Sequence, residues 1–129
     1  MPRFDYDLIV IGAGSGGISS AILSNNLAKT TALLEKQKIG GECTWTGCVP
    51  SKALIRAAET AHEVQQMHRL GLRNDEAASL NTDGVMDHVR SVIHDVYEEE
   101  TPQVFEDKGI DVYIGGAEFV DPHTISTGD

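Results

Sequence analysis

The sequence has 129 residues, which is enough for a single domain with a hydrophobic core. Its hydrophobic content of 40% argues against disorder, and no apolar run approaches the roughly 20 residues that a membrane-spanning helix needs. The formal net charge is −10 because residues 51–129 carry six basic and sixteen acidic side chains, and this excess disfavours nucleic acid or an anionic membrane as a partner.

The first 35 residues predict a strand, a glycine-rich turn, a helix and a second strand. Residues 7–11 form a continuous apolar run, which is typical of a strand buried on both faces. This run is too short to be a signal peptide, and acidic residues precede it. Residues 18–27 predict the helix and residues 30–35 the second strand, so the two strands should be parallel with a right-handed crossover.

The middle of the sequence predicts two longer helices. A glycine-rich loop with both cysteines leads to Pro50, which suits the first turn of a helix. Apolar side chains then recur at helical spacing until Gly71, a suitable C-cap. A polar loop over residues 74–81 precedes a second amphipathic helix over residues 85–96.

The C-terminal part predicts a short helix and three strands. Thr101 and Pro102 suit the start of a helix that ends at Gly109. We expect a small β-meander from three short strands at residues 110–114, 118–120 and 124–126. A doubly wound sheet normally has more strands than these, so we interpret the chain as part of a longer protein.

Three glycines between the first strand and the first helix match the pattern G-x-G-x-x-G. Gly12 permits a tight turn, Gly14 lets the backbone approach a pyrophosphate, and Gly17 allows close packing of helix on strand. Glu35 ends the second strand, where a carboxylate accepts hydrogen bonds from an adenosine ribose and would repel a 2′-phosphate. The pattern predicts a Rossmann-like α/β fold that binds FAD or NAD, without choosing between them. The alternative is a glycine-rich turn that binds no ligand.

The two cysteines, Cys43 and Cys48, are separated by four residues. They form no disulfide framework of a small secreted domain, and we expect a cytoplasmic protein in which the pair has a redox or metal role. The five histidines are scattered without ligand spacing, which disfavours structural zinc, and two unpaired structural thiols are the other alternative. We expect a reversible disulfide in which Cys48, just before the predicted helix, favours the thiolate while Cys43 is more available to a substrate.

Residues 40–52, GGECTWTGCVPSK, resemble the redox-active disulfide signature of the class I pyridine nucleotide–disulfide oxidoreductases. This family includes dihydrolipoamide dehydrogenase, glutathione reductase and mercuric reductase. Residues 7–17 resemble its N-terminal FAD fingerprint, and residues 109–126 resemble the segment that closes the meander of its FAD domain. Residues 1–129 are therefore interpreted as the N-terminal part of an FAD-binding domain, with the pyridine-nucleotide and dimerisation domains outside this chain.

The resemblance implies a nucleotide site for FAD. The glycines Gly12, Gly14 and Gly17 would bind its pyrophosphate and Glu35 its adenosine ribose. The backbone of Ala117 would touch the adenine.

The resemblance also implies a redox site. Cys48 would be the charge-transfer thiol beside the flavin, and Cys43 the thiol that meets the substrate. Lys52 would lie near the flavin ring, where a cation can stabilise reduced flavin. Electrons would pass from NAD(P)H to FAD, then to the disulfide, then to a small-molecule, disulfide or metal-ion substrate, in a homodimer of the full-length protein.

Two departures from the family lie beside the thiols. Residues 44–46, Thr-Trp-Thr, stand where family members usually carry Asn, and Glu42 replaces a more common Thr or Val. Because of these departures the resemblance does not identify the substrate, although residues 46–52 are most similar to mercuric-reductase-like members. Trp45 has two interpretations, packing within the domain or contact with a substrate. The alternative function is a standalone FAD-binding or interaction module with a structural disulfide and no turnover.

Overall fold

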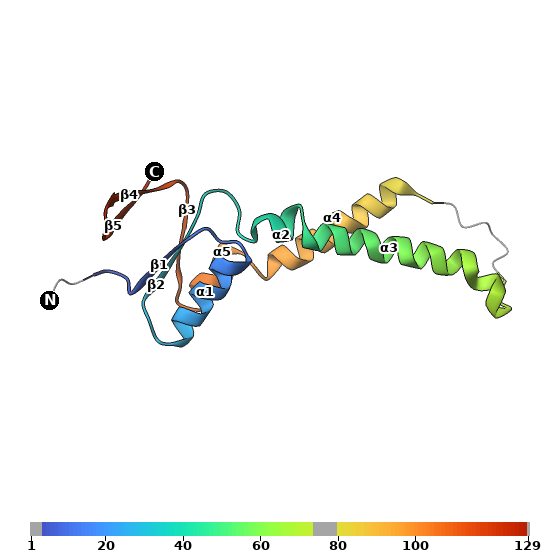
Figure 1. Ribbon diagram of the computed structural model, residues 1–129, viewed down its shortest axis with the longest axis horizontal. Coiled ribbons are helices and arrows are strands. Elements are labelled where there is room, and N and C mark those ends of the chain that lie inside the picture. Colours follow the sequence, from blue (N-terminus) through green and yellow to red (C-terminus); the bar gives the residue numbers. More distant parts are fainter. Residues whose placement is uncertain (1–3, 74–79, 129) are drawn as a thin grey trace.

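The computed structural model describes residues 4–73 and 80–128 and shows the predicted α/β architecture. Figure 1 shows an elongated molecule in which a pair of long helices extends from an α/β body. The body consists of β1 (Leu8–Ile11), α1 (Ser15–Asn26), β2 (Thr31–Glu35), α5 (Pro102–Glu106), β3 (Asp111–Ile114), β4 (Ala117–Asp121) and β5 (Thr124–Thr127). The extension consists of α3 (Cys48–Gln66), η1 (Met67–Leu70) and α4 (Thr82–Glu98), and the short helix α2 (Gly41–Trp45) lies at the junction.

The strand β2 lies in the middle of a parallel three-stranded sheet, between β1 and β3. It pairs with β1 through partners such as Val10 and Leu33, and with β3 through partners such as Leu33 and Val112. Residues 31–34 are at most 4% exposed because neighbouring strands and packed side chains surround β2. The predicted parallel pairing of the first two strands is confirmed.

The helix α1 begins three residues earlier than the sequence predicted. Gly14 is its N-cap and Ser15 its first residue, whereas the prediction started at Ile18. Glycine has poor helix propensity, so Gly16 and Gly17 hid the first turn in the sequence. The earlier start places the unpaired amides of the first turn directly at the glycine-rich turn.

The region predicted as a loop around the cysteines contains the helix α2. Gly40 is its N-cap, with a left-handed φ of 104°. The following helix α3 begins at Cys48, so Pro50 is its third residue, where the backbone nitrogen has no partner within a helix in any case. Both cysteines therefore lie in helices.

The long helices α3 and α4 pack side by side and run in opposite directions (Figure 1). The helix η1 ends at Gly71, whose φ is 74°, and the predicted C-cap is confirmed. The helix α4 is longer than predicted and is capped by Asn81, whose side-chain oxygen accepts a 3.1 Å hydrogen bond from the amide of Gly84. Most of the predicted polar loop, residues 74–79, lies outside the described residues. None of the described helices has the length and apolar character needed to cross a membrane.

The three C-terminal strands do not form one meander. The first of them, β3, joins the parallel sheet beside β2, and only β4 and β5 form an antiparallel pair. The short helix α5 explains this difference because the chain turns back at Gly109, with a φ of 88°, and buries Ile110 completely at the start of β3. The exposed edge of β2 thereby gains a hydrogen-bonding partner.

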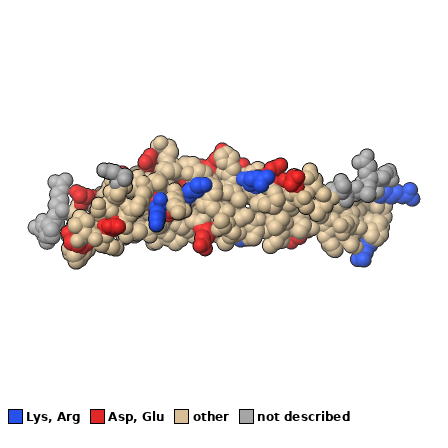
Figure 2. All heavy atoms as spheres, turned by 90° about the horizontal axis from the view of Figure 1, so that it is seen from above, with Lys and Arg blue, Asp and Glu red and all other residues tan. Residues whose placement is uncertain are grey.

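The hydrophobic core lies beneath the glycine-rich turn, between the sheet, α1 and α5. Its buried members are Ala13, Ala21, Leu33, Ile39, Phe105 and Ile110. On the face shown in Figure 2, basic and acidic side chains are scattered along the molecule.

Candidate functional site

The glycine-rich turn has the geometry of a phosphate-binding turn. Gly12 adopts a φ of +96°, which favours glycine, and a Cβ on Gly17 would lie only 1.8 Å from the carbonyl oxygen of Gly12. A Cβ on Gly14 would meet nothing within 4 Å. No side chain caps α1 and no acidic residue lies in its first turn, so the helix N-terminus is available to an anion.

The Glu35 carboxylate lies beside this turn. Its Oε2 accepts a 2.8 Å hydrogen bond from the amide of Ala13, and its Oε1 accepts a 2.9 Å bond from the amide of Gln37. A carboxylate has about four lone-pair sites, so both oxygens can still accept hydrogen bonds from a ligand. The two backbone bonds fix its orientation.

A small hollow of about 170 Å³ brings three of the predicted site residues together: Gly12, Glu35 and Ala117. Gly115 closes one side, and its amide donates a 2.8 Å hydrogen bond to the carbonyl oxygen of Glu35. The sequence reasoning missed Gly115. Its signal was the Gly-Gly pair between two predicted strands, since its φ of 150° favours glycine at the turn into β4.

The cysteine pair spans two helices. Cys43 lies in α2 and is partly buried, while Cys48 is the first residue of α3 and is exposed. Both thiols are free in this structure, so the disulfide stays a prediction.

The two thiols interact, and the interaction shifts their pKa values in opposite directions. The pKa of Cys43 is lowered, mainly because the Cys48 thiol donates a hydrogen bond to its thiolate. The pKa of Cys48 is raised because it is the donor of that bond and its charge would repel the Cys43 thiolate. The prediction considered only the helix N-terminus at Cys48 and omitted the hydrogen bond between the thiols.

Two further side chains act on the pair. A hydrogen bond from Ser15 lowers the pKa of Cys43, and the positive charge of Lys52 contributes a smaller lowering for both thiols. Lys52 is exposed and lies one turn after Cys48 on α3. The sequence reasoning missed Ser15, because nothing in the glycine pattern indicates that its first helical residue faces the cysteines.

The nucleotide turn is in direct contact with the N-terminus of α2, the helix that carries Cys43. The amide of Gly40 donates a 2.8 Å hydrogen bond to the carbonyl oxygen of Ala13. A Cβ on Gly41, whose φ is +61°, would lie 2.9 Å from the Cα of Gly14. Glycine at these positions therefore allows the N-terminus of α2 to approach the N-terminus of α1.

Trp45 packs within the domain. Its indole Nε1 donates a 2.8 Å hydrogen bond to the carbonyl oxygen of Ile39, and its ring lies 4.9 Å from the ring of Tyr97 in α4. The ammonium of Lys38 lies 4.4 Å from the centre of the Trp45 ring. These contacts favour the packing interpretation of this residue.

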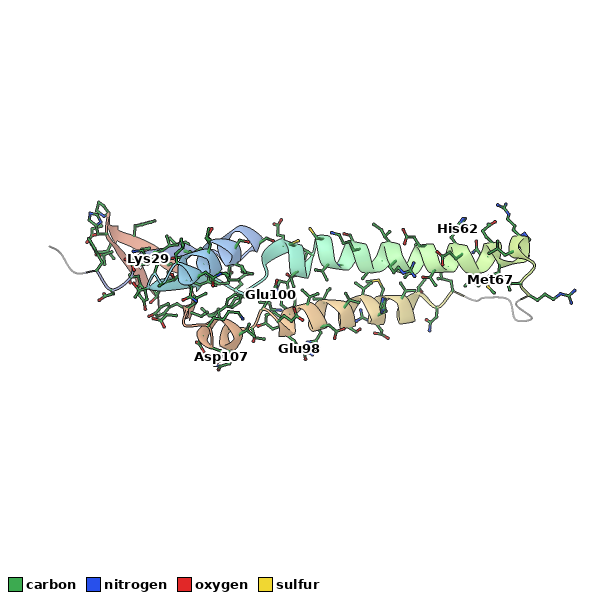
Figure 3. All side chains as sticks on the ribbon, turned by 90° about the horizontal axis from the view of Figure 1, so that it is seen from below. Lys29, His62, Met67, Glu98, Glu100 and Asp107 are labelled. Carbon is green, nitrogen blue, oxygen red and sulfur yellow. The ribbon has the colours of Figure 1, made fainter. Side chains whose placement is uncertain are left out.

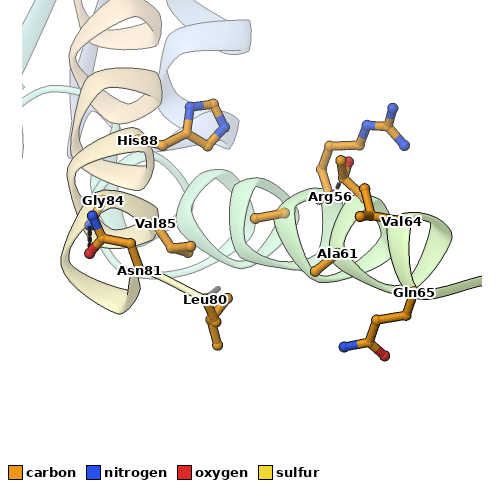
Figure 4. A pocket seen from close by; sticks show the side chains of 11 residues that line it. Arg56, Ala61, Val64, Gln65, Leu80, Asn81, Gly84, Val85 and His88 are labelled. Atoms are coloured by element: carbon orange, nitrogen blue, oxygen red, sulfur yellow. Dashed lines mark hydrogen bonds between the residues drawn. The ribbon is translucent and has the colours of Figure 1, made fainter. Parts of the chain in front are cut away.

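A larger hollow of about 550 Å³ lies between α3 and α4 (Figure 4). Figure 4 shows Ala61, Val64 and Val85 beside it, and none of the predicted site residues lines it. The candidate site is therefore the smaller region where the glycine turn, Glu35 and the cysteine pair meet.

The residues around the glycine turn fit an adenine dinucleotide. A free helix N-terminus, an open position at Gly14 and an oriented carboxylate at Glu35 supply the donors and acceptors that a pyrophosphate and a ribose require. The thiol pair beside them could exchange electrons with a carrier bound there.

Comparison with known proteins agrees with this geometry. Residues 6–128 match the protein family described as pyridine nucleotide-disulphide oxidoreductase. The chain belongs to this family. It is a family of FAD-dependent oxidoreductases, and the α/β fold of this chain is that of part of an FAD-binding domain.

Individual relatives carry two kinds of name. Dihydrolipoyl dehydrogenase of Bacillus subtilis is 34% identical over 122 residues, which are 95% of this chain and 25% of that protein. Dihydrolipoyl dehydrogenase 3 of Haloarcula marismortui is 37% identical over 124 residues, 92% of this chain and 24% of that protein. Mercuric reductase of Bacillus cereus is 31% identical over 123 residues, 95% of this chain and 19% of that protein. The chain thus spans at most about a quarter of these relatives.

Proposed function

We propose that this chain is the FAD-binding portion of an NAD(P)H-dependent flavoprotein disulfide reductase. The observation that carries the proposal is the direct contact between the two halves of the site, in which Gly40 bonds to Ala13 and Gly41 packs on Gly14. This contact sets a reducible pair of thiols beside a turn suited to a dinucleotide. A nucleotide site alone would not require it.

The nucleotide half would bind FAD through backbone and carboxylate groups. The amides at the start of α1 and the open backbone at Gly14 would hold the pyrophosphate, as Gly12 and Gly17 keep the turn tight. Glu35 would accept hydrogen bonds from the adenosine ribose, and the backbone of Ala117 would line the adenine side of the same hollow.

The redox half would use the two cysteines in different roles. FAD, when bound, would take two electrons from NAD(P)H and pass them to the Cys43–Cys48 disulfide, which becomes two thiols. Cys43 would then attack the substrate, because hydrogen bonds from Cys48 and Ser15 favour its thiolate. Cys48 would be the thiol on the flavin side and would re-form the disulfide with Cys43 as the substrate takes up the electrons. The positive charge of Lys52 would favour anionic groups at this point.

The substrate would be a metal ion or a small disulfide. The name mercuric reductase suggests the metal ion, and the name dihydrolipoyl dehydrogenase suggests a dithiol–disulfide couple, of which it names the dithiol form. We further propose that the full-length protein is a cytoplasmic homodimer. The competing proposal is an FAD-binding or interaction module with a structural disulfide and no turnover.

The test is made on the full-length gene product. We expect a yellow, FAD-containing protein that oxidises NADH or NADPH when lipoamide, glutathione disulfide or Hg²⁺ is the acceptor. Bound FAD without oxidation of either nicotinamide by any acceptor would support the module instead. Size-exclusion chromatography with light scattering would test the dimer.

A further inference from the structure

We infer that Glu100 is a positioning residue for the cysteine pair: it holds α2, and therefore Cys43, against the glycine-rich turn through Thr44. The inference rests on the proposed function for its effect on turnover. Its structural basis is a set of contacts between the end of α4 and the two residues that follow Cys43.

The first contact is a hydrogen bond between side chains. The hydroxyl of Thr44 donates a 2.8 Å bond to Oε2 of Glu100, just beyond the end of α4. Thr44 is only 3% exposed, and Glu100 is half-buried. Figure 3 shows Glu100 at the junction between the α/β body and the long helices. A buried hydroxyl bonded to a carboxylate fixes α2 more strongly than a solvent-exposed pair would.

The second contact joins Glu100 to the glycine-rich turn. A Cβ on Gly40 would lie 2.6 Å from Oε2 of Glu100 and 2.7 Å from the Cβ of Thr44, so only glycine fits between them. The amide of the same Gly40 donates its hydrogen bond to Ala13. Glu100, Gly40 and Ala13 therefore form a continuous line of contacts from α4 to the nucleotide site.

The third contact comes from the adjoining residue of α2. The ring of Trp45 packs against Tyr97, one turn before Glu100, at 4.9 Å between ring centres. Thr44 and Trp45 both lie between the two cysteines. The same end of α4 contacts both side chains, which fixes α2 at two adjacent points.

Holding α2 in place affects the chemistry of Cys43. Its lowered pKa depends on hydrogen bonds from Cys48 on α3 and Ser15 on α1, and Lys52 on α3 also favours the thiolate. These bonds require α2 to stay close to both helices. If α2 is released, the pKa of Cys43 should rise toward that of a free thiol.

The sign of this effect separates positioning from simple charge. Removing the negative charge of Glu100 without moving α2 would lower the pKa of Cys43 or leave it unchanged, because a carboxylate disfavours a nearby thiolate. A rise after removal of Glu100 can therefore come only from lost positioning.

The experiment measures alkylation of each cysteine in the reduced full-length protein as a function of pH, with the two sites resolved by mass spectrometry. We expect Glu100→Ala and Thr44→Val to raise the apparent pKa of Cys43 by about one unit, which is roughly a tenfold loss of thiolate at pH 7. The double variant should raise the apparent pKa of Cys43 no further than either single variant does. Glu100→Gln keeps an acceptor oxygen for Thr44 and should retain the low pKa. Glu99→Ala is the matched control, since the Glu99 side chain makes no hydrogen bond or ion pair among the described residues.

Turnover is measured separately. A pKa of Cys43 that stays unchanged in Glu100→Ala and Thr44→Val overturns the inference, as does a pKa that falls. If the wild-type protein reduces no acceptor, the proposed function is overturned. If the pKa of Cys43 nevertheless rises in Glu100→Ala and Thr44→Val, the positioning role is still supported.

Discussion

The backbone amide of Ala13 donates a 2.8 Å hydrogen bond to Oε2 of Glu35. The carbonyl of the same Ala13 accepts the hydrogen bond from Gly40, so one buried residue joins the carboxylate of the nucleotide site to the segment that carries Cys43. The position of Glu35 is therefore coupled to the redox half of the site.

Replacing Glu35 with Ala should weaken FAD binding in the full-length protein. A hydrogen bond from a ribose to a carboxylate contributes on the order of 1.5–3 kcal/mol, which corresponds to roughly a tenfold to hundredfold rise in Kd. Flavin content after gel filtration measures the effect, and Glu35→Gln should retain more flavin than Glu35→Ala. If Glu35→Ala retained as much FAD as the wild type, Glu35 would not be part of the FAD site.

Gly17 and Gly16 offer a matched pair for the glycine-rich turn. A Cβ on Gly17 would lie 1.8 Å from the carbonyl oxygen of Gly12, so Gly17→Ala must displace α1 from the turn and should destabilise the protein by about 1–3 kcal/mol. A Cβ on Gly16 would meet nothing within 4 Å, and Gly16→Ala should stabilise the helix by about 0.5–1 kcal/mol. Urea denaturation midpoints compare the two variants, and equal midpoints would contradict the packing argument.

The reduced cysteine pair should react unequally. Because the pKa of Cys43 is lowered and that of Cys48 is raised, the Cys43 thiolate should persist to lower pH than the Cys48 thiolate. Iodoacetamide at pH 7 should therefore modify Cys43 first, and its rate should fall as the pH drops through the pKa of Cys43. Faster modification of Cys48 across the pH range would show that the helix N-terminus outweighs the hydrogen bond between the thiols.

The pair should also form a disulfide on oxidation. We expect free-thiol titration of the oxidised full-length protein to find no reactive thiol at these positions until dithiothreitol is added. Two reactive thiols before reduction would contradict the prediction.

Serine variants assign the two roles in the full-length protein. Cys48→Ser should abolish long-wavelength absorbance between a thiolate and FAD after two-electron reduction. Cys43→Ser should show this absorbance, because it removes the hydrogen bond and the charge that raise the pKa of Cys48, and it should block substrate reduction. The expected difference follows from the proposed place of Cys48 on the flavin side. The opposite pattern in the two variants would exchange their roles.

The sequence predicted the parts of the fold whose signals are local. The apolar run of β1, the glycine pattern and the amphipathic stripes of α3 and α4 each reflect neighbouring residues, and the structure contains these elements. The start of α1 and the helix α2 were missed because glycines weaken the helical pattern at both places. In the structure, packing against β1 stabilises α1, and packing against α4 stabilises α2. The placement of β3 depends on pairing with β2, a distant contact that strand propensity does not encode.

The candidate site shows the same division. Gly12 and Glu35 lie where β1 and β2 end, and Ala117 lies at the start of β4, so the three residues share one hollow; their contact with FAD stays a prediction. The sequence reasoning considered only the helix N-terminus at Cys48, whereas the acidity of the two thiols also depends on contacts across helices, including the one with Ser15. The bond between Thr44 and Glu100 joins residues 56 positions apart, so no local pattern could reveal it.

The pairing of β2 with β3 makes the long helices an excursion between two adjacent strands. Residues 36–110 leave the sheet at Glu35 and return to it at Asp111, so strand pairing closes a long loop of chain. The entropy of loop closure rises only by about 0.6 kcal/mol for each doubling of loop length. Lengthening or shortening α3 and α4 together at their far end should therefore cost the sheet little. The length of α3 and α4 can therefore change at that end of the molecule. At the other end, the positions of the two helices are constrained because they hold α2 and the thiols in place.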